Sequence, residues 1–233
     1  MRHRGDVTRV LGVDACPAGW VGVAVRDGYD GAYVAARIDE LVAAAHDDGA
    51  LAVVGVDMPI GLPDAGVREA DLLARTMIGT RRASVFATPV RAALAYEEYA
   101  EALRVNQERS GAGISRQAFG LRGKLLEVDA WVRGTDQRVV EVHPEVSFAA
   151  LAGAPLTAGK KTWSGMVHRR DLLATAGIVL PADLGPAGAA GVDDVLDAAA
   201  AAWSADRVAT GQARCLPQIP QTFSDLLPAA IWY

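Results

Sequence analysis

Cysteine, lysine, aromatic residues and long apolar runs are all scarce in this chain of 233 residues. Its two cysteines, Cys16 and Cys215, lie near opposite ends and form no CxxC pair, which argues against a disulfide framework and a structural zinc site. The longest uncharged stretch, 146–159, contains Pro155 and is shorter than the roughly 18 to 20 apolar residues of a membrane span. We therefore expect a cytoplasmic protein with no membrane partner, and we predict no signal peptide.

Two motifs of nucleotide and ester chemistry are also missing. The sequence has no GxxxxGKS/T loop, which excludes P-loop phosphate binding, and no GxSxG elbow for a serine nucleophile. The net charge of −5 argues against a protein that coats nucleic acid non-specifically. Positive charge is nevertheless concentrated in residues 68–133, with 11 basic and 8 acidic side chains, and in residues 160–170, with 4 and none. These two stretches are where we expect contacts to phosphate.

The first quarter of the chain predicts three strands, a helix and a buried strand. Residues 10–13 and 20–25 are rich in valine and are joined by a Pro/Gly turn, which is typical of a hairpin. Residues 31–36 predict a third strand, and the alanine-rich stretch 38–46 predicts a short helix. The nearly all-apolar run 51–56 is typical of a central strand that is covered on both faces.

The rest of the chain is mostly helical in its pattern. Residues 67–134 predict a helical insertion that caps the substrate site, and 138–143 predict one further strand. The other predicted helices are 67–77, 90–108 and 117–132 within the insertion, and 146–151, 166–175 and 192–208 after it. Ser164 is a candidate N-cap, and the residues after Pro217 predict an irregular tail. The pattern indicates an α/β fold in a single domain over residues 1–233.

Several acidic residues lie where solubility does not require them. Asp14 and Asp57 end apolar strands, Glu141 interrupts another, and Asp194 and Asp197 project from one face of the last helix. Functional groups collect beyond the carboxyl ends of parallel strands in open sheets, so these side chains are expected to converge. A cluster of carboxylates requires a cation or raised pKa values, and oxygen ligands select Mg²⁺ or Mn²⁺. Taken singly, each is equally well explained as a turn residue or a helix cap.

Five segments carry a family resemblance: GVDACPAGWVGVAV, VVGVDMPIGLP, RRASVFATPVRAAL, EVHPEVSF and DDVLDAAAAAW. Over about residues 9–210 they resemble a family of predicted nucleases with the ribonuclease H-like fold. The resemblance implies a mixed sheet flanked by helices, with divalent cations bound by an acidic residue in the first strand, here Asp14, and one at the end of the fourth, here Asp57. The DxxDA helix motif is similar to that of Holliday-junction resolvases and is matched by Asp194 and Asp197.

The resulting hypothesis is a metal-dependent hydrolase of phosphodiester bonds in a nucleic acid or a nucleotide-derived phosphate ester. Glu141 and Glu145 are further catalytic candidates. The candidates for binding the substrate's phosphates are Arg81, Arg82, Lys124, Lys160 and Lys161. For Trp20 and Trp163 we expect packing rather than base stacking, because aromatic residues are only 6% of the chain.

Two alternatives remain open. Sugar kinases, heat-shock ATPases and actin share the fold that the resemblance implies, so an ATP-binding phosphotransferase or ATPase is one alternative, although those proteins normally duplicate the domain. The other is a non-catalytic binding protein that keeps the fold. Convergence of the carboxylates in one cleft favours catalysis, and dispersed carboxylates favour binding. The sequence does not decide between DNA, RNA and a small ester, and it predicts no oligomeric state.

Overall fold

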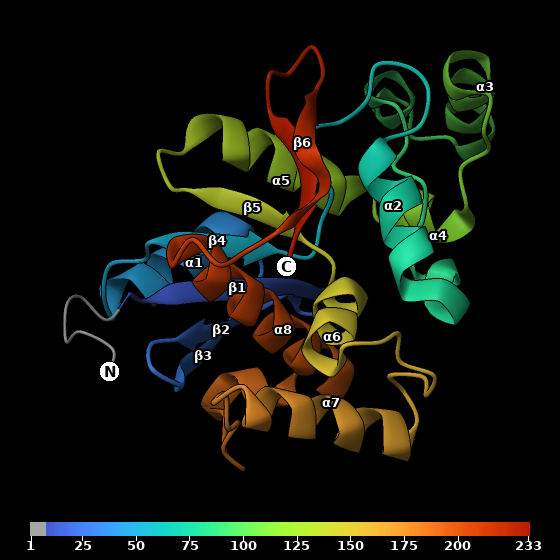
Figure 1. Ribbon diagram of the computed structural model, residues 1–233. Helices are drawn as coiled ribbons and strands as arrows, with labels where there is room; N and C mark the ends of the chain where they lie inside the picture. Colours follow the sequence, from blue (N-terminus) through green and yellow to red (C-terminus); the bar gives the residue numbers. More distant parts are fainter. Residues whose placement is uncertain (1–7) are drawn as a thin grey trace.

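A mixed sheet of seven strands runs through the computed structural model, which describes residues 8–233 (Figure 1). The strand order is β3-β2-β1-β4-β5-β7-β6. The strands are β1 (Val10–Cys16), β2 (Gly19–Val25), β3 (Tyr29–Ala35), β4 (Val53–Val56), β5 (Val139–Val142), β6 (Cys215–Thr222) and β7 (Pro228–Trp232). The central strands β1, β4, β5 and β7 are parallel, so their carboxyl ends lie at one edge of the sheet.

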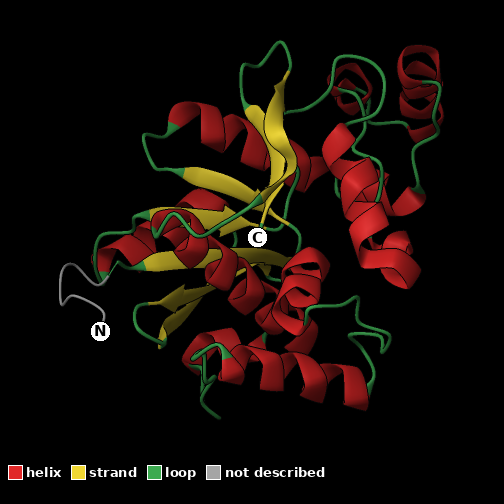
Figure 2. Ribbon diagram, in the orientation of Figure 1, coloured by secondary structure: helices red, strands yellow, loops and turns green. Residues whose placement is uncertain are grey.

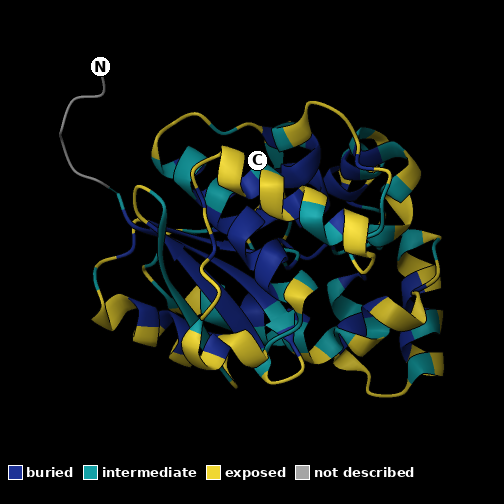
Figure 3. Cartoon of the chain, turned by 90° about the horizontal axis from the view of Figure 1, so that it is seen from below, coloured by how far each residue is buried: buried dark blue, intermediate teal, exposed yellow. Residues whose placement is uncertain are grey.

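Helices cover both faces of this sheet (Figure 2). They are α1 (Ile38–Asp47), α2 (Glu69–Ile78), η1 (Gly79–Ser84), η2 (Arg91–Ala95), α3 (Tyr99–Ser110), α4 (Arg116–Gly120), α5 (Arg122–Gly134), α6 (Pro144–Ala152), α7 (Trp163–Thr175), η3 (Gly185–Ala189) and α8 (Val192–Ala209). One apolar core joins the sheet to α1 and α5, and another joins its opposite face to α6, α7 and α8. The architecture is therefore an α/β fold, with the strands buried between two helical layers (Figure 3).

The alternation of side chains along β1 and β4 decides which residues meet α8. Leu11 and Val54 belong to the core beneath α1 and α5, so the residues next to them in each strand point to the opposite face. Gly12 and Gly55 are such neighbours, and they pair with each other in the parallel register of β1 and β4. The same alternation, continued by two residues, points Asp14 and Asp57 toward α8.

The sequence of α8 allows it to lie unusually close to the sheet. Its buried alanines, Ala198 to Ala202, offer no bulk, and the strands opposite them carry glycines. A Cβ added to Gly12 would lie 2.0 Å from the backbone nitrogen of Ala202, and one added to Gly55 would lie 2.7 Å from the Ala201 carbonyl oxygen. The helix backbone therefore packs directly on the two strands, and this contact fixes where the helix begins relative to their ends.

The helices between β4 and β5 divide into two groups. The last of them, α5, packs on the sheet beside α1 like an ordinary connecting helix. The group from α2 to α4 stands beside the sheet in Figure 1, with one small apolar cluster of its own and a second that it shares with α6 and β7. None of the helices in residues 8–233 combines the length and apolarity needed to cross a bilayer.

Three of the predicted elements differ from the structure. The predicted tail after Pro217 instead contains most of β6 and the whole of β7, and β7 pairs in parallel with β5. The predicted helix 90–108 is the short helix η2, a break and α3. The N-cap of α7 is Thr162, whose hydroxyl accepts from the Gly165 N–H, and Ser164 lies inside the helix.

Candidate metal centre and its pocket

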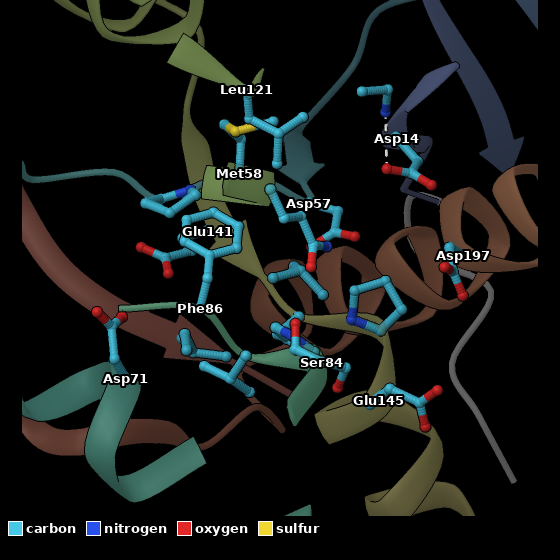
Figure 4. A pocket seen from close by; sticks show the side chains of 18 of the residues that line it. Asp14, Asp57, Met58, Asp71, Ser84, Phe86, Leu121, Glu141, Glu145 and Asp197 are labelled. Atoms are coloured by element: carbon cyan, nitrogen blue, oxygen red, sulfur yellow. Dashed lines mark hydrogen bonds between the residues drawn. The ribbon is translucent and has the colours of Figure 1, made fainter. Parts of the chain in front are cut away.

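Three aspartates from distant parts of the chain meet at the carboxyl edge of the sheet. Asp14 belongs to β1, Asp57 follows β4, and Asp197 lies in α8. One carboxylate oxygen from each lies within 4.8 Å of those from the other two (Figure 4). We call these three residues the aspartate triad. The convergence predicted from the sequence is confirmed for them, whereas Asp194 lines the same pocket but lies outside the triad.

The backbone accounts for this convergence. The Asp57 N–H donates to the Val13 carbonyl at 2.8 Å, which extends the pairing of β4 with β1 and sets Asp57 beside Asp14. The close packing of α8 on Gly12 and Gly55 then brings Asp197, at the start of its alanine run, over the ends of both strands. Local hydrogen bonding holds the first carboxylate, since Asp14 Oδ1 accepts from the Ala15 N–H at 2.7 Å.

Burial and mutual repulsion disfavour the ionised form of the triad. Burial is the main cause that raises the pKa of Asp57 to about 7, and it does the same for Asp197. The pKa of Asp14 is raised well above its ordinary value by burial and by the charges of Asp57 and Asp197. Burial and the neighbouring Asp193 also raise the pKa of Asp194. The cluster therefore carries more negative charge than its surroundings stabilise.

Among residues 8–233, Lys160 is the cationic side chain that hydrogen-bonds to the triad. Its Nζ donates to Asp197 Oδ2 at 2.5 Å and lies 3.7 Å from Asp193 Oδ2. Burial alone would lower the pKa of Lys160, but Asp197 reverses this and holds the pKa above its ordinary value. One ammonium balances only one of the three carboxylates, so the remaining charge is neutralised either by protons, which the raised pKa values favour, or by a cation.

The donor set fits a hard divalent cation. All three candidate ligands supply carboxylate oxygen, they lie close enough to share one ion, and no cysteine or histidine belongs to the group. Oxygen-only sites are typical of Mg²⁺, Mn²⁺ and Ca²⁺ rather than zinc or copper. The three carboxylates are thus a group that could hold a metal ion.

The two glutamate candidates, Glu141 and Glu145, are engaged elsewhere by buried arginines. Glu141 Oε2 accepts from Arg68 Nη2 at 2.6 Å and from the Ile60 N–H at 2.8 Å. Arg169 Nη2 donates to both oxygens of Glu145, at 2.7 and 2.8 Å. Both arginines are 0% exposed. Burial raises the pKa of Glu141 to about 7, and the charge of Arg68 opposes that rise. Both glutamates line the pocket, but neither belongs to the triad.

The triad lies at one end of a cavity of about 290 Å³. Sheet residues and α8 provide the acidic end, and the group from α2 to α4 with the segments that flank it provides much of the opposite wall (Figure 4). The residues of that wall that the sequence did not indicate are Ser84, Val85, Phe86, Gln117 and Leu121, together with Met58 next to Asp57. These residues show no pattern in the sequence that indicates a site. They become neighbours of the aspartates because the fold brings residues 84–121 against the edge of the sheet.

The candidate phosphate ligands separate into two groups. Arg81 and Lys160 line the pocket, and Arg81 Nη2 lies 3.7 Å from Glu145 Oε1. Arg82 lines a different hollow, and the side chain of Lys161, which is 81% exposed, lines another beside Trp163. Lys124 Nζ lies 3.4 Å from Glu127 Oε2 on α5, outside the pocket. The sequence offered no acidic neighbours for the lysines at 160 and 161, whereas the structure supplies them from α8.

The two tryptophans behave differently. Trp20 is 0% exposed, with its Nε1–H donating to Glu127 Oε1 at 3.0 Å, so the packing prediction is confirmed there. For Trp163 it is wrong, because this side chain is 78% exposed at the start of α7. His143 precedes α6, and burial lowers its pKa, which suits a packed neutral imidazole.

Comparison with known proteins gives one relationship. No curated protein and no solved structure matches the chain. A family model described as "Protein of unknown function (DUF429)" matches residues 12–222. That match includes every member of the aspartate triad and both walls of the pocket. The chain therefore belongs to the DUF429 family.

Proposed function

We propose that this protein is a divalent-metal-dependent hydrolase of phosphodiester bonds, acting on a nucleic acid or a nucleotide-derived phosphate ester. One observation carries the proposal. Asp14, Asp57 and Asp197 converge at one end of an open pocket, with a single lysine to balance them. Carboxylates that only stabilise a fold are normally each paired with a cation, and a buried cluster of three that shares one lysine is typical of a functional site.

The placement of the aspartates supports a ribonuclease H-like site. Asp14 lies in the first strand, and Asp57 directly follows the fourth. These are the two positions at which the resembled family binds divalent cations. Asp197 supplies the third ligand from the final helix, and Asp194, one turn earlier, is near enough to the pocket to complete a second site.

In this proposal Mg²⁺ or Mn²⁺ is held by the aspartate triad. When bound, such ions supply Lewis-acid stabilisation and an activated water for in-line displacement at phosphorus. The chain's own residues bind and orient the ester. Lys160 and Arg81 line the pocket with N–H donors that fit phosphate oxygens. Glu145, held by Arg169, lies 3.7 Å from Arg81 and so orients its guanidinium.

The test is a manganese-supplemented cleavage screen over single-stranded, duplex and branched substrates. Wild type should cleave at least one of them, and Asp14→Asn should lose at least about 100-fold in rate, because a neutral amide is a weaker cation ligand. Asp136→Asn is the matched control, since Asp136 is exposed and far from the pocket lining. Equal activity in wild type and Asp14→Asn would refute the proposed site. ATP turnover without cleavage would favour the phosphotransferase alternative instead.

A further inference from the structure

The pocket has a second, less acidic end that the proposed chemistry does not use. Met58, Phe86 and Leu121 line it, and Figure 4 shows them with Glu141 on the side away from Asp14 and Asp197. Building on the proposed function, we propose that this end holds one unpaired nucleobase of the substrate, and that Glu141 recognises an amino group on the edge of that base. The structure thus assigns the substrate class as an ester with an accessible base.

The apolar walls suit a flat ring. Met58 is almost fully buried, while Phe86 and Leu121 are partly exposed to the pocket. An aromatic face and a thioether both make favourable contacts with the faces of heterocycles. A simple alkyl ester would leave the ring of Phe86 without a flat partner. A base would lie between these side chains while its phosphate extends toward the triad.

Glu141 is the polar group that distinguishes one base from another. Its Oε2 is occupied by Arg68 and by the Ile60 N–H, whereas no donor in residues 8–233 bonds to Oε1. Arg68 is 0% exposed, so it fixes the carboxylate in place. An acceptor with few partners in a pocket requires a donor from the ligand or from water. Carboxylates accept from the exocyclic amino group of cytosine, and uracil presents a carbonyl oxygen at the same position.

The neighbouring carboxylate of Asp71 does not compete for this role. Its Oδ2 accepts from the Thr88 N–H at 2.7 Å, and its Oδ1 accepts from the Thr88 hydroxyl at 3.2 Å. Gln117 is exposed on α4 at the mouth of the same pocket, so its amide is free to meet a second edge atom of the base. The recognition group is thus one fixed acceptor, Glu141, and an exposed amide that lines the same pocket.

The size of the cavity limits what enters. A volume of about 290 Å³ lies at the small end of ligand pockets, which are roughly 300 to 1,000 Å³. It accommodates one base with its phosphate but not a base pair. The base could come from a free nucleotide or from an unpaired strand end, which share this chemistry. A duplex must first expose a base, as in enzymes that flip their target nucleotide.

Binding of nucleoside monophosphates, measured by calorimetry with Mn²⁺ present, tests the base pocket without requiring turnover. Wild type should bind CMP at least tenfold more tightly than UMP. Phe86→Leu should weaken the binding of CMP at least fivefold, while the Mn²⁺ affinity and the melting temperature should stay within error of the wild-type values. Glu141→Gln should reduce the ratio of CMP to UMP affinity to below threefold. Equal affinity for CMP and UMP in wild type would overturn the role of Glu141, and unchanged CMP binding in Phe86→Leu would overturn the base pocket.

A second set of ligands separates the two sources of the base. CMP, a single-stranded oligonucleotide ending in cytidine and a blunt duplex of the same sequence are compared at equal salt. Tighter binding of CMP supports a free nucleotide, tighter binding of the single strand supports a strand end, and tightest binding of the duplex overturns the inference. If Phe86-dependent binding occurs but no diester is cleaved, the base pocket stands and the hydrolase proposal fails. If the Phe86 and Glu141 variants cleave a diester as fast as wild type does, the hydrolase proposal stands and the base pocket fails.

Discussion

Two sets of buried carboxylates lie within one pocket of this protein and differ in their partners. Glu141 and Glu145 each accept hydrogen bonds from an arginine of their own, and both arginines are completely buried. The aspartate triad shares the single ammonium of Lys160. Both sets are acidic residues in or next to strands and helices that reach the same sheet edge, so position alone does not separate them.

The difference in partners indicates a difference in role. A buried carboxylate that accepts hydrogen bonds from a buried arginine has its charge balanced, and the pair holds the surrounding elements together. A group of carboxylates with too little positive charge costs stability, and a protein retains it where a ligand makes up the deficit. We therefore interpret the arginine-paired glutamates as fixed parts of the pocket wall, with Oε1 of Glu141 left to accept from a ligand, and the triad as the metal-binding part. Each prediction below tests one side of that division.

The largest effect is expected from removing one of the two paired arginines. Arg169→Met should lower the free energy of unfolding by about 3 to 5 kcal/mol, because buried Glu145 would lose both hydrogen bonds from Arg169 and keep only the longer contact with Arg81. Urea denaturation measures this loss. The double variant Glu145→Gln with Arg169→Met should recover a large part of it, since no charge is then left alone. A loss below about 1 kcal/mol in the single variant would show that the pair is not structural.

The next effect concerns the packing of α8 on β1 and β4. Gly12→Ala places a Cβ 2.0 Å from the Ala202 nitrogen, so helix and strand must separate. We expect a loss of about 3 kcal/mol in unfolding free energy and a clear weakening of Mn²⁺ binding, because Asp197 moves away from Asp14. Gly123→Ala is the control, since nothing lies within 4 Å of that position and the helix should gain about 0.5 to 1 kcal/mol. Unchanged Mn²⁺ affinity in a folded Gly12→Ala protein would contradict the role of this contact.

Metal addition tests the triad directly. Mn²⁺ at about 100 times its dissociation constant should stabilise the wild-type protein by about 2.7 kcal/mol, visible as a rise in melting temperature. Asp57→Asn should show little of that rise, while Asp136→Asn should show all of it. EDTA should reverse the effect in wild type. If Asp57→Asn and wild type respond alike, Mn²⁺ binds somewhere other than the triad.

The convergence of the aspartate triad could be predicted in part from the sequence. Asp14 and Asp57 end apolar strands and Asp197 begins an alanine run, so the alternation of strands and the helical repeat already place them on facing surfaces. Asp194 and Asp197 share one face of the helix at i and i+3, and the sequence predicts that both join the cluster. In the structure Asp194 lies nearer the start of α8 and outside the triad. A spacing within one helix fixes a shared face but not how far the helix extends beyond the sheet.

Other parts depend on contacts between distant segments. Lys160 meets Asp197 across 37 positions, and Arg68 meets Glu141 across 73, and no local pattern encodes either pair. The strands β6 and β7 escaped prediction because Pro217 and Pro220 interrupt the first, and neither shows a regular apolar alternation. The exposure of Trp163 follows from the orientation of α7, which its own sequence does not determine.

The smallest expected effect compares two aspartates with opposite pH dependence. Asp30 receives hydrogen bonds from Arg9 Nε and Arg26 Nη2, and these pairs lower its pKa despite partial burial. Its stabilisation, on the order of 0.5 to 1 kcal/mol, is present above the ordinary pKa of about 4 and is lost as the pH falls through the lowered value. In Asp57 burial raises the pKa to about 7, so the metal-free folded state loses stability as the pH rises from about 4 to 7.

Urea midpoints in EDTA, measured between pH 2.5 and 8, separate the two slopes. Asp30→Asn should remove stability at pH 6 and converge with wild type at the acid end, because the wild-type carboxyl is then protonated as well. Asp57→Asn should match wild type near pH 4 and exceed it, by on the order of 1 kcal/mol, at pH 8. If the stabilities of Asp30→Asn and Asp57→Asn depended on pH in the same way, the two carboxyl groups would not have pKa values shifted in opposite directions. The contrast between the two aspartates requires that, as the pH rises, Asp30→Asn falls below wild type in stability and Asp57→Asn rises above it. Only the aspartate with a raised pKa retains a proton that a metal ion can replace.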